Sequence, residues 1–335
     1  MEIEAKMKIH HISLLTEDLD TNLKFYTKIL GLRLVKNSVN QAFPRRRHLY
    51  YGDFMGTPGT IVTFFPINPF RKRTDVNHYW SGINFAIPRD SLIYWRDRLQ
   101  NNGYKTEVDS RHVLHVVDQD GVTLQFKERD DELYDWHINY QSDIPETKQI
   151  IGVIGSTLAV PDPNKTAEFF HDLFGCQIKD NQIQLEKREH LDLVQTPLDA
   201  PEKKWGRGSV DHLALAVEST AQLHYYWEKA GENGWQRELF TDRGYFRSAY
   251  FIEPGGCRVE LATTNPGFTL DESLYNLGTT LSLPPLLESE REMLTNFYAE
   301  KGINFDDVEP YTGNGYLNNR SSKPLKGEAY NDSNQ

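Results

Sequence analysis

Three side chains able to bind a metal ion occupy equivalent points of a repeated sequence pattern. His11 lies in the apolar segment 9–15, His212 lies in the similar segment 210–215, and Glu260 lies between two apolar residues further along the chain. Two imidazoles and one carboxylate are a known ligand set for divalent metals that keep open coordination positions. Because the three residues are far apart in the chain, only a shared position in a repeated fold would bring them together.

Four segments share one order of expected elements: an apolar strand, an amphipathic helix that ends near a glycine, and further strands. They open at residues 10–15, 82–88, 155–162 and from residue 212 onward. The glycines that end the first three helices are 72 residues apart in each interval: Gly31, Gly103 and Gly175. Such spacing indicates duplication of one βαβββ unit. The closing strands are expected at 59–64, 121–126 and 256–261, with a less distinct one in the third module near 182–185.

The opening strands can be aligned on their last residues. His11 and His212 then share one position, and the second and third modules carry Gly82 and Gly155 there. A single histidine on a strand is more often a structural, half-buried residue than a ligand. Two imidazoles at one repeat position favour a shared metal, which requires the first and fourth modules to face each other and the other two to form a second pair.

Alignment of the closing strands adds the carboxylate. Thr63, Gln125 and Glu260 fall at one position, so only the fourth module supplies an acid. A charged residue between Val259 and Leu261 seldom points inward without a partner or a metal. Since Thr63 offers no carboxylate, the predicted site keeps open positions, which favours substrate and dioxygen binding at iron over a closed structural site.

Bulk composition limits the classes of function. The chain has 335 residues, 38% of them hydrophobic and 25% charged, with a formal net charge of −11. Neither nucleic acid nor an acidic membrane is an expected partner, because both attract clustered Lys and Arg. No stretch approaches the roughly 20 apolar residues of a membrane span, and the first residues do not resemble a signal peptide. The two cysteines, Cys176 and Cys257, suggest no disulfide framework, so we expect a cytoplasmic protein.

The repeat predicts an α+β fold in which four βαβββ modules pair into two curved mixed β-sheet barrels, modules 1 with 4 and 2 with 3. We expect an acidic linker over 129–148 and a helix over 289–301. The expected domains are an N-terminal domain 7–128, a C-terminal domain 149–265, a C-terminal extension 266–310 and a disordered tail 311–335.

Several motifs resemble the vicinal oxygen chelate superfamily, which includes glyoxalase I, bleomycin-resistance proteins and extradiol dioxygenases. More narrowly, the chain is similar to bacterial hydroquinone-type ring-cleaving dioxygenases, over roughly residues 7–290. The motifs that carry the resemblance are HHI at 10–12, LGLRLVK at 30–36, HLYYGD at 48–53, GTPGT at 56–60, YFRS at 245–248 and EPGG at 253–256. HLYYGD followed by GTPGT is the most specific of them.

The resemblance implies that His11, His212 and Glu260 hold Fe(II), with Mn(II) as the alternative ion, and that no organic cofactor is bound. It also implies catalytic roles for His10, Tyr250 and Arg243. A nearby His or Tyr is useful because a diphenol must lose a proton on binding iron and the ring-opened product must regain one. The positive charge of Arg243 is suited to stabilising the oxyanion of a phenolate or peroxo intermediate. The alternative to a catalytic role is structural in each case: Tyr250 would be an aromatic core residue on a strand, and Arg243 a solvated loop residue.

One departure from the family concerns Asp211. The family often has a His pair at this strand, whereas here Asp211 precedes His212. Its ordinary pKa of about 3.9 makes it a different acid or base from His, and we assign it a catalytic role. His48 is interpreted as structural, as are the three histidines without an assigned partner: His78, His112 and His115.

The sequence therefore predicts a non-haem Fe(II) dioxygenase that opens hydroquinone- or catechol-like rings, in quinone detoxification or aromatic degradation. Its expected partners are a small aromatic substrate and O2, and a homo-oligomer is compatible with the sequence. Two other classes stay open: a glyoxalase-like metal-dependent isomerase or thiol transferase, and a non-catalytic protein that binds aromatic ligands. The first usually fills the site with a fourth protein ligand, and the second predicts no metal.

Overall fold

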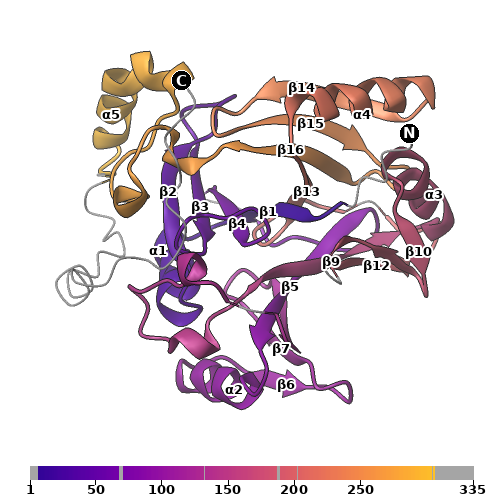
Figure 1. The fold of residues 1–335 in the computed structure, drawn as a ribbon, viewed down its shortest axis with the longest axis horizontal. Coiled ribbons are helices and arrows are strands. Elements are labelled where there is room, and N and C mark those ends of the chain that lie inside the picture. The colour runs from indigo at the N-terminus through magenta and orange to yellow at the C-terminus, as the bar shows by residue number, and fades with distance from the viewer. Residues whose placement is uncertain are drawn as a thin grey trace.

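The computed structural model describes residues 7–67, 71–131, 133–186, 189–201, 203–303 and 305. Sixteen strands in this part of the chain form one mixed sheet that curves but does not close. Helices α2, α3 and α4 lie on its outside, and the C-terminal helix α5 lies at one end (Figure 1). The expected α+β class is confirmed.

The strands and helices group into four modules. The first contains β1 (Ile9–Thr16), α1 (Leu19–Leu23) with a π-helical continuation (Lys24–Ile29), β2 (Arg33–Val39), β3 (Arg47–Gly52) and β4 (Ile61–Pro66). The second contains β5 (Tyr79–Pro88), α2 (Leu92–Asn101), β6 (Thr106–Val108), β7 (Leu114–Val117) and β8 (Thr123–Arg129). The third contains β9 (Gly152–Val160), α3 (Pro163–Phe174), β10 (Gln177–Lys179), β11 (Gln182–Gln184) and β12 (His190–Gln195). The fourth contains β13 (Val210–Val217), α4 (Thr220–Glu232), β14 (Gln236–Asp242), β15 (Phe246–Ile252) and β16 (Arg258–Pro266).

Each module is a βαβββ unit whose opening strand runs parallel to its closing strand: β1 with β4, β5 with β8, β9 with β12 and β13 with β16. The predicted position of the closing strand in the third module was wrong. Residues 182–184 form β11, the middle strand of a meander, and the closing strand is β12. In β12, buried Leu191 and Leu193 alternate with half-buried His190 and Asp192, a short and half-polar pattern that is hard to recognise in sequence.

The modules pair as predicted. Strand β1 is antiparallel to β13, which joins modules 1 and 4, and β5 is antiparallel to β9, which joins modules 2 and 3. A bridge between Val210 and Trp80 then links β13 to β5. The two pairs are therefore halves of one continuous sheet rather than two separate barrels.

Local signals explain how a helix such as α3 is delimited. The Asp162 carboxylate caps its first turn by accepting from the Lys165 amide, and Pro163 stands in the first turn, where its missing N–H costs nothing. Gly175 ends the helix with a φ of 72°, a left-handed conformation that favours glycine. The inward residues Phe169, Phe170 and others then pack into the main apolar core under the sheet.

After β16 the chain continues as an extension that packs on the first module. It contains 3-10 turns at Phe268–Leu270, Leu274–Asn276 and Pro285–Glu290, and the expected helix over 289–301 is present as α5 (Arg291–Ala299). Leu281 bridges to Asn37 of β2, and a small apolar cluster that includes Val39, Leu283 and Leu294 fills the contact. The predicted tail 311–335 lies outside the described residues.

The segment expected as a linker, 129–148, contains two short 3-10 turns, Asp135–His137 and Glu146–Lys148, between β8 and β9. None of the helices in the described ranges is long and apolar enough to cross a membrane.

Candidate metal centre

The structure brings His11, His212 and Glu260 together as predicted. The two Nε2 atoms are 3.2 Å apart, and Glu260 Oε2 lies 3.2 Å from His11 Nε2 and 2.8 Å from His212 Nε2. Register explains the meeting: His11 pairs with Ala214, and Ala214 pairs with Glu260 on the next strand. All three side chains are buried, at 2%, 4% and 0% exposure.

In both candidate ligand histidines, the preceding residue contacts Nδ1 and so orients the imidazole ring. Asp211 Oδ2 lies 2.6 Å from His212 Nδ1, and His10 Nδ1 lies 2.8 Å from His11 Nδ1. Burial and the neighbouring His11 lower the pKa of His10 to about 3, so His10 is neutral and its Nδ1 can accept a hydrogen bond from His11. In both ligand histidines Nδ1 contacts the preceding residue, so Nε2 is the nitrogen directed toward Glu260.

The three candidate ligands and Asp211 shift one another's pKa values. Burial raises the pKa of Glu260, but the two facing imidazoles outweigh it and hold that pKa well below its ordinary value. Burial also opposes protonation of His212, yet Glu260 and Asp211 raise its pKa to about 9, whereas burial lowers the pKa of His11. Ser248 Oγ donates to Glu260 Oε1 at 2.5 Å, which leaves Oε2 for the imidazoles.

These donors fit a divalent metal ion. Oε2 of Glu260 is buried and receives no well-formed hydrogen bond from the described residues, so its lone pairs face the same point as the two Nε2 atoms. Ligands that each bind one ion at about 2.1 Å and at right angles lie about 3 Å apart, as these three do. At the position equivalent to Glu260, the Thr63 hydroxyl contacts Ser13 Oγ at 2.8 Å and His48 Nε2 at 2.9 Å. Within the described residues, three donors therefore meet at this point, and an ion held there would keep open positions.

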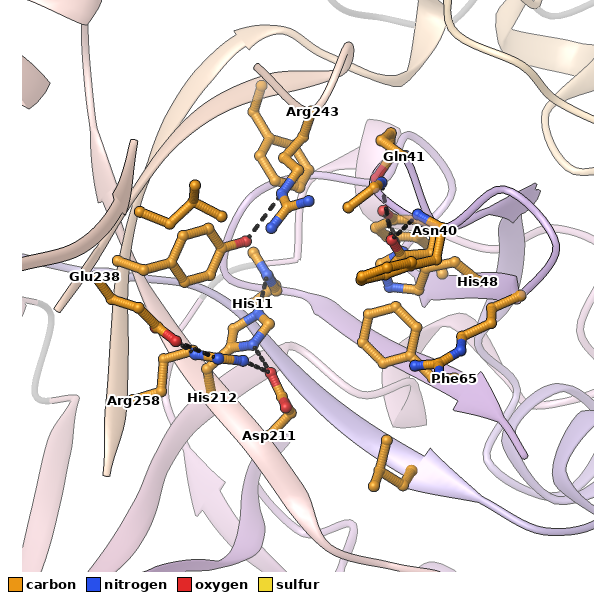
Figure 2. Close-up of a pocket in the computed structure, with 18 of the residues that line it drawn as sticks. His11, Asn40, Gln41, His48, Phe65, Asp211, His212, Glu238, Arg243 and Arg258 are labelled. Carbon is orange, nitrogen blue, oxygen red and sulfur yellow. Dashed lines mark hydrogen bonds and ion pairs between the residues drawn. The ribbon is translucent and has the colours of Figure 1, made fainter. Parts of the chain in front are cut away.

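A cavity of about 260 Å³ opens over His11 and His212. Part of its wall is apolar and suited to a flat ring: Leu15, Phe65, Ile67, Phe246 and Leu239. Another part is formed by the connection between β2 and β3, which includes Asn40 and Gln41 (Figure 2). The cavity thus combines an apolar ring-sized space with the candidate metal donors.

Arg243 and Tyr250, which the sequence analysis named as site residues, both line this cavity. Arg243 Nε donates to the Tyr250 hydroxyl at 3.2 Å, and its guanidinium lies 5.1 Å from the centre of the Tyr250 ring. Burial, and then the Glu260 carboxylate, raises the pKa of Tyr250 well above its ordinary value. The phenol therefore keeps its proton and can act as a hydrogen-bond donor.

Asp211 lines the cavity and is also tied to a basic residue that the sequence reasoning missed. Arg258 Nη1 donates to Asp211 Oδ2 at 2.8 Å, and Nη2 donates to Glu238 Oε1 at 2.5 Å (Figure 2). Burial raises the pKa of Asp211, but its contacts with His212 and Arg258 outweigh this and hold that pKa well below its ordinary value, so Asp211 is an anion. Its observed contacts are those of an orienting acceptor.

His48, which the sequence suggested was structural, lies in the cavity wall with Tyr50. The Tyr50 hydroxyl is 2.7 Å from His48 Nδ1, and the His48 ring stacks on Phe65 with centroids 3.9 Å apart. Burial, and then His11, lowers the pKa of His48 well below its ordinary value. The sequence did contain a signal for this placement. His48 and Tyr50 are two residues apart on one strand, so their side chains point to the same face of the sheet.

The remaining histidines named above lie outside the cavity lining. His78 contacts the Gly255 carbonyl, and His115 pairs with Asp109 at 3.2 Å. His112 adopts a φ of 58° in the turn before β7.

Comparisons with known proteins agree with this fold. The profile of the Glyoxalase/Bleomycin resistance protein/Dioxygenase superfamily matches residues 8–126 and 150–261. "Putative ring-cleaving dioxygenase MhqA" of Bacillus subtilis (strain 168) is 34% identical over 306 residues, covering 84% of this chain and 95% of that protein. The chlorohydroquinone/hydroquinone 1,2-dioxygenase of Sphingobium indicum is 26% identical over 311 residues, covering 85% and 94%. The crystal structure of a "putative dioxygenase" from Bacillus subtilis subsp. subtilis str. 168 matches with a TM-score of 0.80 and 28% identity, covering 87% of this chain and 96% of that one. The chain therefore belongs to the Glyoxalase/Bleomycin resistance protein/Dioxygenase superfamily.

Proposed function

We propose that this protein is a ring-cleaving dioxygenase that uses Fe(II) to open hydroquinone- or catechol-like aromatics. The observation that carries the proposal is the convergence of His11 Nε2, His212 Nε2 and Glu260 Oε2 beneath an aromatic-lined cavity. The names of the relatives support the same reaction class, since they include ring-cleaving dioxygenases and a hydroquinone 1,2-dioxygenase.

The proposed ion is held by His11, His212 and Glu260. When bound, Fe(II) supplies a Lewis acid for the phenol and a path for electrons between the ring and O2. Mn(II) accepts similar donors, so metal content decides between the two ions.

The surrounding side chains bind the ring and handle its protons. Phe65 and Phe246 bound the apolar space in which an aromatic ring would lie. His48 is neutral and contacts Tyr50 through one ring nitrogen and Thr63 through the other, so we assign it to shaping the cavity wall. Tyr250, held protonated, is a donor suited to returning a proton to the opened product.

Arg243 supplies fixed positive charge to the same cavity. Its side chain is half-buried, and its Nε donates a hydrogen bond to the neutral hydroxyl of Tyr250. A cation that is held in place and partly removed from water stabilises an oxyanion that forms beside it. We assign Arg243 this role for the phenolate and for the carboxyl group of the opened product.

The test is oxygen uptake by protein loaded anaerobically with Fe(II), using panels of hydroquinones and catechols. We expect one O2 consumed per ring opened, and loss of this activity in His212→Ala. His224→Ala is the matched control, because His224 is exposed on α4 and stacks on Phe240 outside the cavity.

Other outcomes would favour the alternative classes. Full activity in His212→Ala, or wild-type protein that binds no divalent metal, would refute the proposal. Oxygen-independent turnover of a thiol adduct would favour a glyoxalase-like enzyme. Tight binding of an aromatic ring by metal-free protein without turnover would favour a binding protein.

A further inference from the structure

The C-terminal extension contacts both walls of the cavity. One wall is the pocket loop, defined as residues 40–46 between β2 and β3, of which Asn40, Gln41, Phe43 and others line the cavity. The other is the Arg243 turn, defined as residues 243–245 between β14 and β15. We call residues 266–303 the C-terminal brace.

The brace holds the pocket loop through α5. The Tyr298 hydroxyl donates to the Pro44 carbonyl at 3.1 Å, and the Arg45 guanidinium lies 5.1 Å from the centre of the Phe297 ring. The loop itself is closed by the Arg46 amide donating to the Phe43 carbonyl at 2.9 Å. Phe43 is 61% exposed, so the loop buries little apolar surface of its own, and the contacts from α5 add to the hydrogen bonds within the loop.

The brace also holds the Arg243 turn. The Tyr245 hydroxyl donates to Asp271 Oδ2 at 2.8 Å. Gly244 has a φ of 82°, and a Cβ at this position would collide with the Pro284 ring, so the turn and the brace pack backbone against side chain. The glycine therefore serves both the left-handed turn and the close approach of the brace.

A buried ion cluster anchors the brace between these two contacts. Lys36 Nζ lies 2.5 Å from both Asp271 Oδ1 and Glu272 Oε2, and the Lys36 side chain is fully buried. Ser282 Oγ donates to the same Glu272 oxygen at 2.6 Å. A buried cation with two carboxylates specifies one arrangement of the chain, because displacement of either acid would leave an uncompensated charge.

We propose that the C-terminal brace sets the position of both cavity walls, and that Tyr298 and Tyr245 are positioning residues for the aromatic substrate. One segment, anchored at Lys36, donates a side-chain hydrogen bond to the pocket loop and accepts another from the Arg243 turn. The part of the proposal that concerns substrate affinity rests on the proposed function.

The test uses Tyr298→Phe, which removes only the hydroxyl. One neutral hydrogen bond contributes about 1 kcal/mol, so KM for the aromatic substrate should rise about fivefold while kcat and metal affinity change less than about twofold. Amide hydrogen exchange should accelerate in residues 40–46 and stay unchanged in β1 and β13. Tyr245→Phe should instead accelerate exchange in residues 243–246.

Tyr275→Phe is the matched control. Tyr275 lies in the same brace and is 49% exposed, and its hydroxyl makes no hydrogen bond with any described residue. This variant should behave as wild type in all measurements. Equal KM and equal loop exchange in Tyr298→Phe and wild type would overturn the proposal, as would a parallel loss of metal affinity.

Failure of the proposed function gives a different result. Wild-type protein would then consume no O2 with any aromatic, and the exchange measurement would decide the role of the brace by itself. Faster exchange of residues 40–46 in Tyr298→Phe would support it, and unchanged exchange would overturn it.

Discussion

Replacement of Asp211 by Asn tests whether this residue orients a metal ligand. Asp211 Oδ2 lies 2.6 Å from His212 Nδ1 and is held on its other side by Arg258 at 2.8 Å. The anion holds Nδ1 of His212, so Nε2 is the nitrogen directed toward the other two metal donors. Loss of an outer hydrogen-bonding partner of this kind costs about 10- to 100-fold in metal affinity. We therefore expect the dissociation constant for Fe(II) to rise by that factor in Asp211→Asn, equivalent to about 1.4–2.8 kcal/mol.

The assay is anaerobic titration of metal-free protein with Fe(II) against a competing chelator of known affinity. Asp143→Asn is the control, since Asp143 is a 71% exposed acid that pairs with Arg98 outside the cavity lining. The turnover number of fully loaded Asp211→Asn should stay within about tenfold of wild type, because the acid orients a ligand and does not transfer a proton. A metal affinity within twofold of wild type would refute this reasoning, and so would a loss of turnover greater than 100-fold in fully loaded protein.

Three further predictions concern single side chains. Ser248→Ala should weaken Fe(II) binding about tenfold in the same titration, because Glu260 Oε1 loses its 2.5 Å hydrogen bond; unchanged affinity would contradict this. Tyr250→Phe should keep metal affinity but lower kcat about 100-fold, measured as O2 uptake, if the phenol returns the proton; a kcat near wild type would assign Tyr250 to packing alone. Burial raises the pKa of Asp118 from 3.8 to about 7, so the folded chain binds a proton between about pH 4 and 7 that the unfolded chain has released. The free energy of unfolding measured in urea should therefore fall with rising pH across this range, by up to a few kcal/mol more in wild type than in Asp118→Asn; parallel pH profiles would contradict it.

The pairing of modules and the meeting of the three donors were predictable because both follow from register. Parallel pairing inside each module places a residue of the opening strand beside a fixed residue of the closing strand, as with Ala214 and Glu260. Antiparallel pairing of β1 with β13 then fixes His11 relative to His212. A repeat read from sequence carries this information even though the residues are about 200 positions apart.

Other features depended on contacts that no local pattern encodes. The partner of Asp211 is Arg258, which is 47 residues away on another strand. The closing strand β12 escaped detection since its apolar residues are few and alternate with charged ones. The pocket loop is held by α5, more than 250 residues later in the chain, through a tyrosine whose type alone gave no indication of this contact.

Incorporation of ¹⁸O2 tests the central claim most directly. Fe(II)-loaded protein is given a hydroquinone under ¹⁸O2, and the product is examined by mass spectrometry. The proposed function predicts a ring-opened acid that carries oxygen from ¹⁸O2, with two labelled atoms before exchange with water. A quinone without label, or an unlabelled isomer, would contradict it.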